Sequence, residues 1–176
     1  MVATKKMQNK ITAAAKDVLL APVYLYQGHK IKRDTVRLPE PNGERHGQVQ
    51  LNNSPITSKG KSNNILNLMV VGDSAAAGVG SQTQQEALVG HLIPILTEQA
   101  AIQSAFDTLN WSLQATTGYT SFDILRRLYV LPAPSQPIDV MVLSVGVNDT
   151  TSKVSAAQWQ QQIENIIAIA QRKFGV

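Results

Sequence analysis

The chain has 176 residues, of which 43% are hydrophobic and 16% are charged, and it contains no cysteine. This length and composition favour a single globular domain over a disordered chain. The lack of cysteine excludes disulfide bonds and thiolate metal sites. No apolar run approaches the roughly 18 residues of a membrane-spanning helix.

The net charge of +4 is unevenly distributed along the chain. Residues 1–64 carry 11 Lys and Arg against four acidic residues, which gives +7, whereas residues 65–176 carry five against eight, which gives −3. The basic character therefore belongs to the N-terminal part. A core without a basic surface argues against nucleic acid as a partner.

The first 20 residues interleave lysines with apolar residues at helical spacing. This pattern predicts a basic amphipathic helix that could lie on an anionic membrane surface. Alternatively, the helix packs on the domain with its lysines in solvent. The apolar stretch 18–26 makes a poor signal peptide, because Pro22 interrupts it and no small-residue cleavage site follows. We therefore expect a cytoplasmic protein that could associate with a membrane.

Residues 27–64 are rich in Gly, Pro, Asn, Ser and basic residues and show weak periodicity. Runs such as residues 39–43 predict turns. We interpret this region as an extended or irregular lead-in with a solvated surface. The predicted organisation is therefore a basic N-terminal arm over residues 1–64 and an α/β domain over residues 65–176.

Residues 65–71 form a short run rich in branched apolar residues, which predicts a buried strand. Gly72, Asp73 and Ser74 then turn out of the strand, and small residues follow that let backbone segments approach closely. A helix is predicted over residues 84–103, with a capping box formed by Thr83 and Glu86 and a kink or restart at Pro94.

A second strand is predicted over residues 107–113, followed by a turn that contains Gly118. The next helix should direct Phe122, Leu125 and Leu128 toward the core. Arg126 and Arg127 should lie on its other side.

The third predicted strand covers residues 138–145 and runs into Gly146-Val147-Asn148-Asp149. By itself this tetrapeptide also fits an Asx-type turn. Ser155 and Gln158 form a capping box for the last helix. Its apolar stripe, in which we interpret Trp159 as a core anchor, comprises Trp159, Ile163, Ile166, Ile167 and Ala170.

A strand, a loop and a helix thus follow one another three times, which is typical of a parallel sheet with helices on both faces. The polar candidates Ser74, Gly118 and Asn148 each follow the carboxyl end of a strand. They should therefore converge at one rim of the sheet, where open α/β sheets bind ligands.

These three segments resemble the conserved blocks of the SGNH/GDSL hydrolases, a family of serine esterases and lipases. The resemblance covers residues 65–176 and implies a three-layer α/β/α fold with a flavodoxin-like parallel sheet. It implies that Ser74 is the nucleophile, that Gly118 and Asn148 contribute to the oxyanion hole, and that Asp73 and Asp149 support them. The implied reaction is hydrolysis of a small-molecule carboxylic ester, with no cofactor and no metal.

One family block has no counterpart in this chain. The family takes its general base from a late Asp-x-x-His block, and no such sequence occurs here. The three histidines are His29, His46 and His91, and none matches the family position. We therefore leave the catalytic His and Asp unassigned.

The missing block leads to two structural hypotheses. In a flavodoxin-like sheet the strand at residues 138–145 is interior, so that here it would be an exposed apolar edge. The first hypothesis is that this chain is the N-terminal part of a longer esterase, lacks its C-terminal strands and is incomplete or inactive alone. The second is that another copy covers the edge through self-association.

Two further functions remain open at this stage. The chain could be a binding module that keeps the pocket without catalysing a reaction. It could also be a peripheral membrane protein in which the basic N-terminal arm is the working part. The sequence indicates neither the acyl group nor the alcohol of a substrate.

Overall fold

The computed structural model describes residues 19–176, except residues 32, 35, 37 and 52–63. The chain divides into two compact units, one ending at Arg37 and one spanning Leu38–Val176. In the first unit, residues 19–31 are helical. The amphipathic helix predicted for residues 1–20 falls outside the described residues, apart from its last two positions. Among the described residues, no helix combines the length and apolarity needed to cross a membrane.

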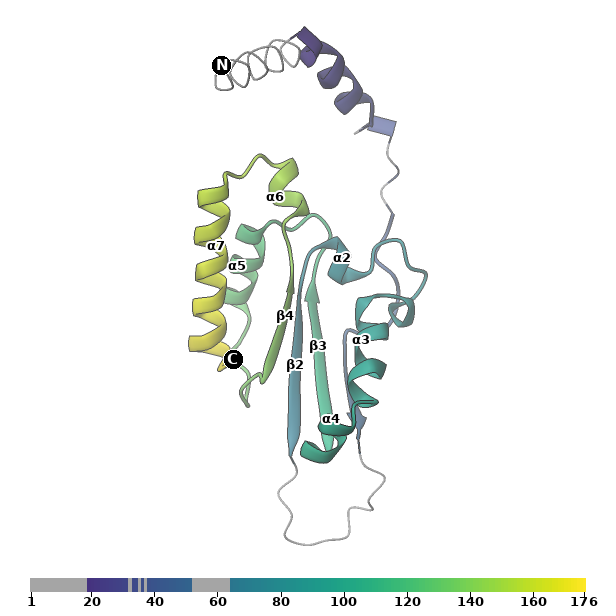
Figure 1. Ribbon diagram of the computed structural model, residues 1–176, viewed down its shortest axis with the longest axis vertical. Coiled ribbons are helices and arrows are strands. Elements are labelled where there is room, and N and C mark those ends of the chain that lie inside the picture. Colours follow the sequence, from purple (N-terminus) through teal and green to yellow (C-terminus); the bar gives the residue numbers. More distant parts are fainter. Residues whose placement is uncertain (1–18, 32, 35, 37, 52–63) are drawn as a thin grey trace, which may run out of the picture. The chain divides into compact units, whose positions relative to one another are not determined.

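A four-stranded sheet lies at the centre of the second unit (Figure 1). Its strands occur in the order β1 (His46–Gln50), β3 (Thr108–Ala115), β2 (Ile65–Gly72) and β4 (Val140–Ser144). The last three are parallel, and β1 runs antiparallel to β3. The three predicted strands are confirmed, and their order is that of the first three strands of a flavodoxin-like sheet.

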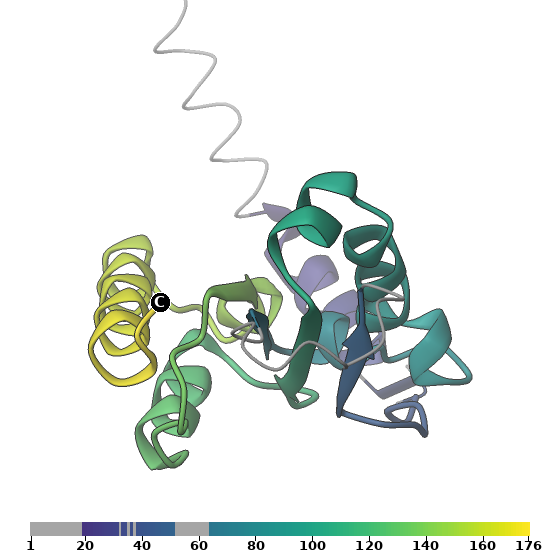
Figure 2. The same cartoon turned by 90° about the horizontal axis from the view of Figure 1, so that it is seen from below.

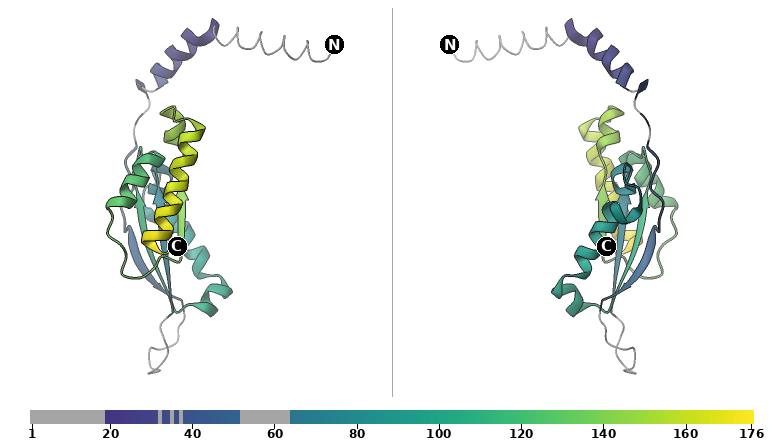
Figure 3. Two further views of the ribbon diagram at one scale, coloured as in Figure 1. Left: turned by 90° about the vertical axis from the view of Figure 1, so that its left-hand side faces the viewer. Right: turned by 90° about the vertical axis from the view of Figure 1, so that its right-hand side faces the viewer.

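Helices cover both faces of this sheet (Figures 2 and 3). α3 (Leu88–Thr97) packs on one face, and α5 (Ser121–Val130) and α7 (Ala156–Ile169) pack on the other. Strand β2 shows why two covers are needed, because its successive side chains point to opposite faces. Val70 belongs to the apolar cluster under α3, and Val71 belongs to the cluster under α5 and α7. The predicted three-layer α/β/α architecture is thus observed.

Strand β1 was not predicted, because its residues lie in the segment that we expected to be irregular. It pairs with β3 from His46↔Ser112 to Gln50↔Thr108, which makes the sheet mixed rather than purely parallel. The unit that contains the sheet accordingly starts at Leu38. The indole of Trp111 lies close over Gly47, since a Cβ on Gly47 would lie 2.8 Å from its Nε1 and would force the indole to move.

The predicted helix over residues 84–103 is divided differently from our expectation. A 3-10 turn at Gln84–Glu86 precedes α3, and a separate helix α4 follows at Ala100–Ala105. Pro94 lies inside α3, and the break comes later, where Gln99 is extended. The predicted capping box is also wrong, because the Thr83 side chain makes no capping hydrogen bond and the Glu86 carboxylate accepts instead from the Gln82 N–H at 3.1 Å.

Two aromatic side chains expected in the core are exposed. Phe122 is 51% exposed, and Ile124 is buried in its place beside Leu125 and Leu128, so that the inward face of α5 is rotated from our prediction. Trp159 is 39% exposed at the start of α7. The predicted capping box of α7 is confirmed, since the Ser155 hydroxyl accepts from the Gln158 N–H while the Gln158 side chain accepts from the Ser155 N–H.

Strand β4 lies at the edge of the sheet as far as the described residues show. It pairs with β2 along one side, from Leu68↔Val140 to Gly72↔Ser144. Val140 is 43% exposed, and the next four residues of the strand are half-buried. Self-association through this edge stays a prediction.

Candidate active site at the carboxyl ends of the parallel strands

The strand register brings the three predicted polar segments to one rim. Gly72, the last residue of β2, lies opposite Ala115 of β3 on one side and Ser144 of β4 on the other. Two hydrogen bonds extend this alignment beyond the strands, from the Asp73 N–H to the Ser144 carbonyl at 3.1 Å and from the Thr116 N–H to the Gly72 carbonyl at 3.2 Å. The segments that carry Ser74, Gly118 and Asn148 therefore leave the sheet side by side.

The turn after β2 is packed too closely for any other first residue than glycine. A Cβ on Gly72 would lie 2.5 Å from the Ser144 carbonyl oxygen and 2.6 Å from the Ala76 Cβ. Asp73 follows, 2% exposed, and its carboxylate accepts from the Ala75 N–H at 3.0 Å. This N-cap starts the short helix α2 (Ser74–Ala77), and it keeps Ser74 half-buried at the rim.

As the first residue of α2, Ser74 has a backbone N–H without a partner inside the helix. The preceding residue, Asp73, uses its buried carboxylate to cap the same helix. Asp73 thus shapes the turn by capping α2.

The loop after β3 presents Gly118 on the surface. Gly118 has φ +86°, in the left-handed region that favours glycine, and a Cβ there would meet nothing within 4 Å. Both Thr117 and Gly118 are exposed. No described residue accepts a backbone hydrogen bond from the Gly118 N–H. This N–H is the one that the family resemblance assigns to the oxyanion hole.

Asn148 and Asp149 connect the third segment to the second. They lie in the short helix α6 (Val147–Thr151), and not in the Asx-type turn that the sequence also allowed. The Asn148 side-chain amide donates to the Tyr119 carbonyl at 2.9 Å. Because an amide NH₂ carries two hydrogens, one remains for another acceptor.

Asp149 is 3% exposed and binds the first residue of α5. Its carboxylate accepts from the Ser121 N–H, at 3.0 Å to Oδ2, and from the Ser121 hydroxyl at 2.5 Å. The Gln162 side chain from α7 contacts the same hydroxyl. Asp149 therefore ties the β4–α6 connection to the start of α5.

A surface hollow of about 410 Å³ lies beside this rim, lined by Gly146, Asp149, Thr150, Val154, Ala156 and Trp159. The exposed Trp159 forms part of its wall. Ser74 does not line the hollow. We therefore assign the hollow no role in substrate binding.

The histidines do not complete a catalytic arrangement within the described residues. His29 belongs to the N-terminal unit, where its Nδ1 contacts the Leu25 carbonyl at 3.1 Å. His46 starts β1, and β3 lies between β1 and β2. The axes of β1 and β2 are therefore two strand spacings apart, about 9.6 Å. His91 is exposed on α3. None of the three has a hydrogen bond with Ser74, and no group of three or more His, Asp and Glu in the described parts of the chain could hold a metal ion.

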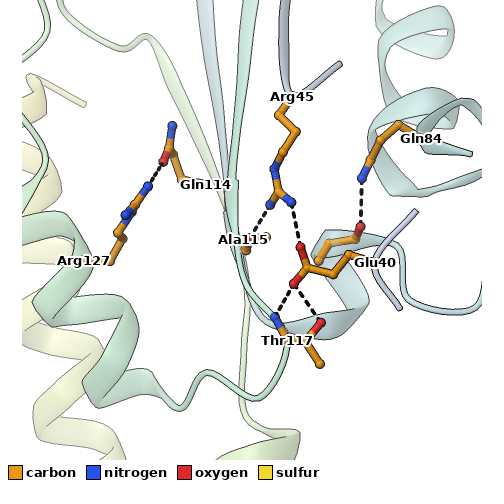
Figure 4. Close-up of polar contacts among 8 residues, drawn as sticks. Glu40, Arg45, Gln84, Gln114, Ala115, Thr117 and Arg127 are labelled. Carbon is orange, nitrogen blue, oxygen red and sulfur yellow. Dashed lines mark hydrogen bonds and ion pairs between the residues drawn. The ribbon is translucent and has the colours of Figure 1, made fainter. Parts of the chain in front are cut away.

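Sequence reasoning missed two charged residues at this rim, Glu40 and Arg45. Glu40 accepts from the Thr117 N–H and hydroxyl, and Arg45 forms an ion pair with Glu40 at 2.8 Å (Figure 4). Local sequence offers no signal for Glu40, which lies in a turn-rich stretch. A signal for β1 was present, because Gly47, Val49 and Leu51 alternate with polar residues as in a half-buried strand.

The profile of the GDSL-like lipase/acylhydrolase family matches residues 70–175 of the chain. The chain belongs to this family. The matched region contains all five of the predicted site residues. A search among curated proteins found no match.

Two solved structures share the fold of part of this chain. The structure described as TesA is 29% identical, with a TM-score of 0.51, over 61% of this chain and 55% of that one. A point mutant of the esterase AlinE4 is 23% identical, with a TM-score of 0.50, over 65% of this chain and 56% of that one. The chain thus spans a little over half the length of the structures that it matches.

Proposed function

We propose that this GDSL-like protein is a serine ester hydrolase, with Ser74 as its nucleophile. The observation that carries the proposal is the register at Gly72, which brings the segments after β2, β3 and β4 to one rim. The family assignment supports it.

In the proposed reaction, the Ser74 hydroxyl attacks the ester carbonyl carbon and the alcohol leaves, which produces an acyl-enzyme that water then hydrolyses. The negative charge that develops on the carbonyl oxygen would be held by the N–H groups of Ser74 and Gly118 and by the second amide hydrogen of Asn148. Such preorganised donors are usually the largest single contribution to this kind of catalysis. We assign the general base to none of the three histidines.

The test compares wild-type protein with Ser74→Ala in two assays. A fluorophosphonate probe should label the wild type at Ser74, and hydrolysis of p-nitrophenyl butyrate should fall by at least about a thousandfold in the variant. Ser135→Ala, which removes an exposed loop serine, is the matched control. Equal labelling and equal hydrolysis in all three proteins would refute the proposal. Saturable ligand binding without labelling or turnover would instead favour the non-catalytic binding module.

We also propose that the N-terminal unit contacts anionic membranes. Its described helix exposes large apolar side chains, including Leu19 at 79%, Leu25 at 63% and Tyr26 at 69%. Basic residues flank this helix in the sequence, so residues 1–37 carry eight Lys and Arg against two Asp. Apolar side chains beside basic ones favour the interface of an anionic bilayer.

Sedimentation with phosphatidylserine vesicles tests this second proposal. Leu25→Asp should weaken binding by about tenfold, because it places a charge on the apolar helix. Phe122→Asp, at a 51% exposed position of α5, is the matched control and should bind like the wild type. Equal binding of the two variants, or equal binding to neutral vesicles, would refute membrane contact through this helix. The cellular location stays a prediction.

A further inference from the structure

The loop that carries Gly118 is a turn closed by a hydrogen bond from the Tyr119 N–H to the Thr116 carbonyl at 3.3 Å, and Tyr119 packs against the apolar cluster under α5 and α7. Thr117 and Gly118 are both exposed, and the space on the Cβ side of Gly118 is empty to 4 Å. Packing thus holds the end of the turn at Tyr119, whereas Thr117 and Gly118 in its middle are held by hydrogen bonds to Thr117.

Glu40 makes two of these bonds through a single oxygen atom. Its Oε1 accepts from the Thr117 backbone N–H at 2.7 Å and from the Thr117 hydroxyl at 2.8 Å (Figure 4). Together these bonds fix both the backbone and the side chain of Thr117. The next peptide group along the chain is the one that contains the Gly118 N–H.

Arg45 holds the other carboxylate oxygen of Glu40 and connects it to the sheet. Its Nη1 donates to Glu40 Oε2 at 2.8 Å, and its Nη2 donates to the carbonyl of Ala115, the last residue of β3. The Arg45 carbonyl accepts from the Leu113 N–H at 2.7 Å, immediately before β1 begins. The guanidinium is therefore anchored to the same strand from which the loop departs.

The contacts with Thr117 and Arg45 stabilise the ionised form of the Glu40 carboxyl group. Burial raises the pKa of the Glu40 carboxyl, but the hydrogen bonds from Thr117 and the neighbouring Arg45 outweigh it, and the pKa lies below its ordinary value. The carboxylate thus stays ionised at neutral pH, in the state that accepts all three donors.

On the far side of Gly118, the Tyr119 carbonyl is held by the Asn148 amide at 2.9 Å. Gly118 is therefore bracketed by two anchored neighbours. We propose that Glu40 and Arg45 are positioning residues, which orient the Gly118 N–H toward the oxygen of an ester substrate. This inference rests on the proposed function and adds a second layer to its oxyanion hole.

The test uses the full chain and four variants. Glu40→Ala removes both bonds to Thr117. Glu40→Gln leaves a single side-chain oxygen, whereas Thr117 and Arg45 bind two different oxygens of the wild-type carboxylate. Arg45→Lys keeps the charge but cannot bridge Glu40 and the Ala115 carbonyl. Glu44→Ala is the matched control, because it removes an exposed carboxylate from the same segment.

Two readouts separate positioning from a structural role. With p-nitrophenyl butyrate, Glu40→Ala should lower kcat by about tenfold and leave KM within about twofold, because a misplaced oxyanion donor affects the transition state more than the bound substrate. By NMR, the Thr117 amide should exchange with solvent at least about tenfold faster, and the Gly118 amide should gain mobility. Amides of β2 should be unchanged, and Glu44→Ala should match the wild type in every readout.

Failure of this inference differs from failure of the proposed function. If wild type and Ser74→Ala are equally inactive, the esterase proposal fails, and the NMR comparison alone decides whether Glu40 orders the loop. If the wild type is active and Glu40→Ala matches Glu44→Ala in kcat and in Thr117 exchange, the positioning role of Glu40 is refuted.

Discussion

The turn after β2 and the loop after β3 lie side by side at the rim, but different forces hold them. The Gly72-Asp73-Ser74 turn is fixed by close contact and by its own capping carboxylate, and it involves residues within four positions of one another together with Ser144. The loop around Gly118 exposes Thr117 and Gly118, and besides its own turn hydrogen bond and the packing of Tyr119 it is tethered by side chains from outside it, Glu40 and Asn148. An atom added to a packed turn forces its neighbours to shift, whereas a tethered loop depends on bonds that a single distant substitution can remove.

The packed turn and the tethered loop suit the two roles proposed for the rim, which are to present the nucleophile and to donate to the oxyanion. A nucleophile must project from a rigid backbone, and close packing supplies that rigidity. For an oxyanion donor the direction of the N–H matters more than close packing around it, because the N–H must face the substrate. Changes to the turn should therefore act on folding, and changes to the tethers should act on catalysis.

The largest effect is expected for Asn148→Ala, which removes a tether and a proposed donor together. Loss of one oxyanion donor should cost about 2.7–4 kcal/mol of transition-state stabilisation. Steady-state kinetics with p-nitrophenyl butyrate measure it as a fall in kcat. Asn110→Ala, which breaks a side-chain bond with Asn67 within the sheet, serves as control. An unchanged kcat in Asn148→Ala would exclude this residue from the oxyanion hole.

Gly72→Ala should lower the free energy of unfolding by about 1–3 kcal/mol, because overpacking forces the neighbouring backbone to shift. At this position the new methyl would lie 2.5 Å from the Ser144 carbonyl oxygen. Urea unfolding measures the change. Gly118→Ala sharpens the comparison, since only its left-handed φ opposes the methyl and the cost should stay near about 1 kcal/mol. Equal costs at the two glycines would contradict the contrast between packed turn and tethered loop.

Ser121→Ala should lower the free energy of unfolding by about 1.5 kcal/mol, because a buried hydrogen bond to the Asp149 carboxylate is lost. Ser104→Ala, which removes an exposed hydroxyl bonded within α4, should change it by less than about 0.5 kcal/mol. Chemical denaturation of both variants provides the measurement. Matching midpoints would show that the Ser121 hydroxyl, in contrast to the Ser121 N–H that the variant keeps, contributes nothing to stability.

The smallest effect is the pH dependence contributed by Glu40. Because the folded-state pKa of Glu40 is lowered, its contribution to stability is present above the ordinary carboxyl pKa of about 4.3 and is lost as the pH falls through the folded-state value. The difference in unfolding free energy between wild type and Glu40→Ala should be under about 1 kcal/mol at pH 7. It should shrink toward pH 3 in urea titrations. A difference that grows on acidification would contradict the assigned sign.

Local pattern was enough to predict the three parallel strands, the capping box of α7 and the position of Ser74, Gly118 and Asn148 after the carboxyl ends of those strands, whereas the roles of these residues stay a prediction. Each depends on a few consecutive residues, such as the apolar run 65–71 and the glycine that must follow it. Side-chain facing was less predictable: Phe122 and Trp159 are apolar in sequence but exposed, since burial depends on which neighbouring element covers them.

The pairing of β1 with β3 and the contacts of Glu40 with Thr117 were decided by the tertiary structure alone. These two residues are 77 positions apart, and neither has a local reason to be near the other. Antiparallel pairing at the sheet edge draws the segment around Arg45 to the end of β3, and only then can a carboxylate from a turn-rich stretch reach the loop after that strand. Short-range propensity places the candidate nucleophile, whereas long-range strand pairing places the groups that hold its neighbouring loop.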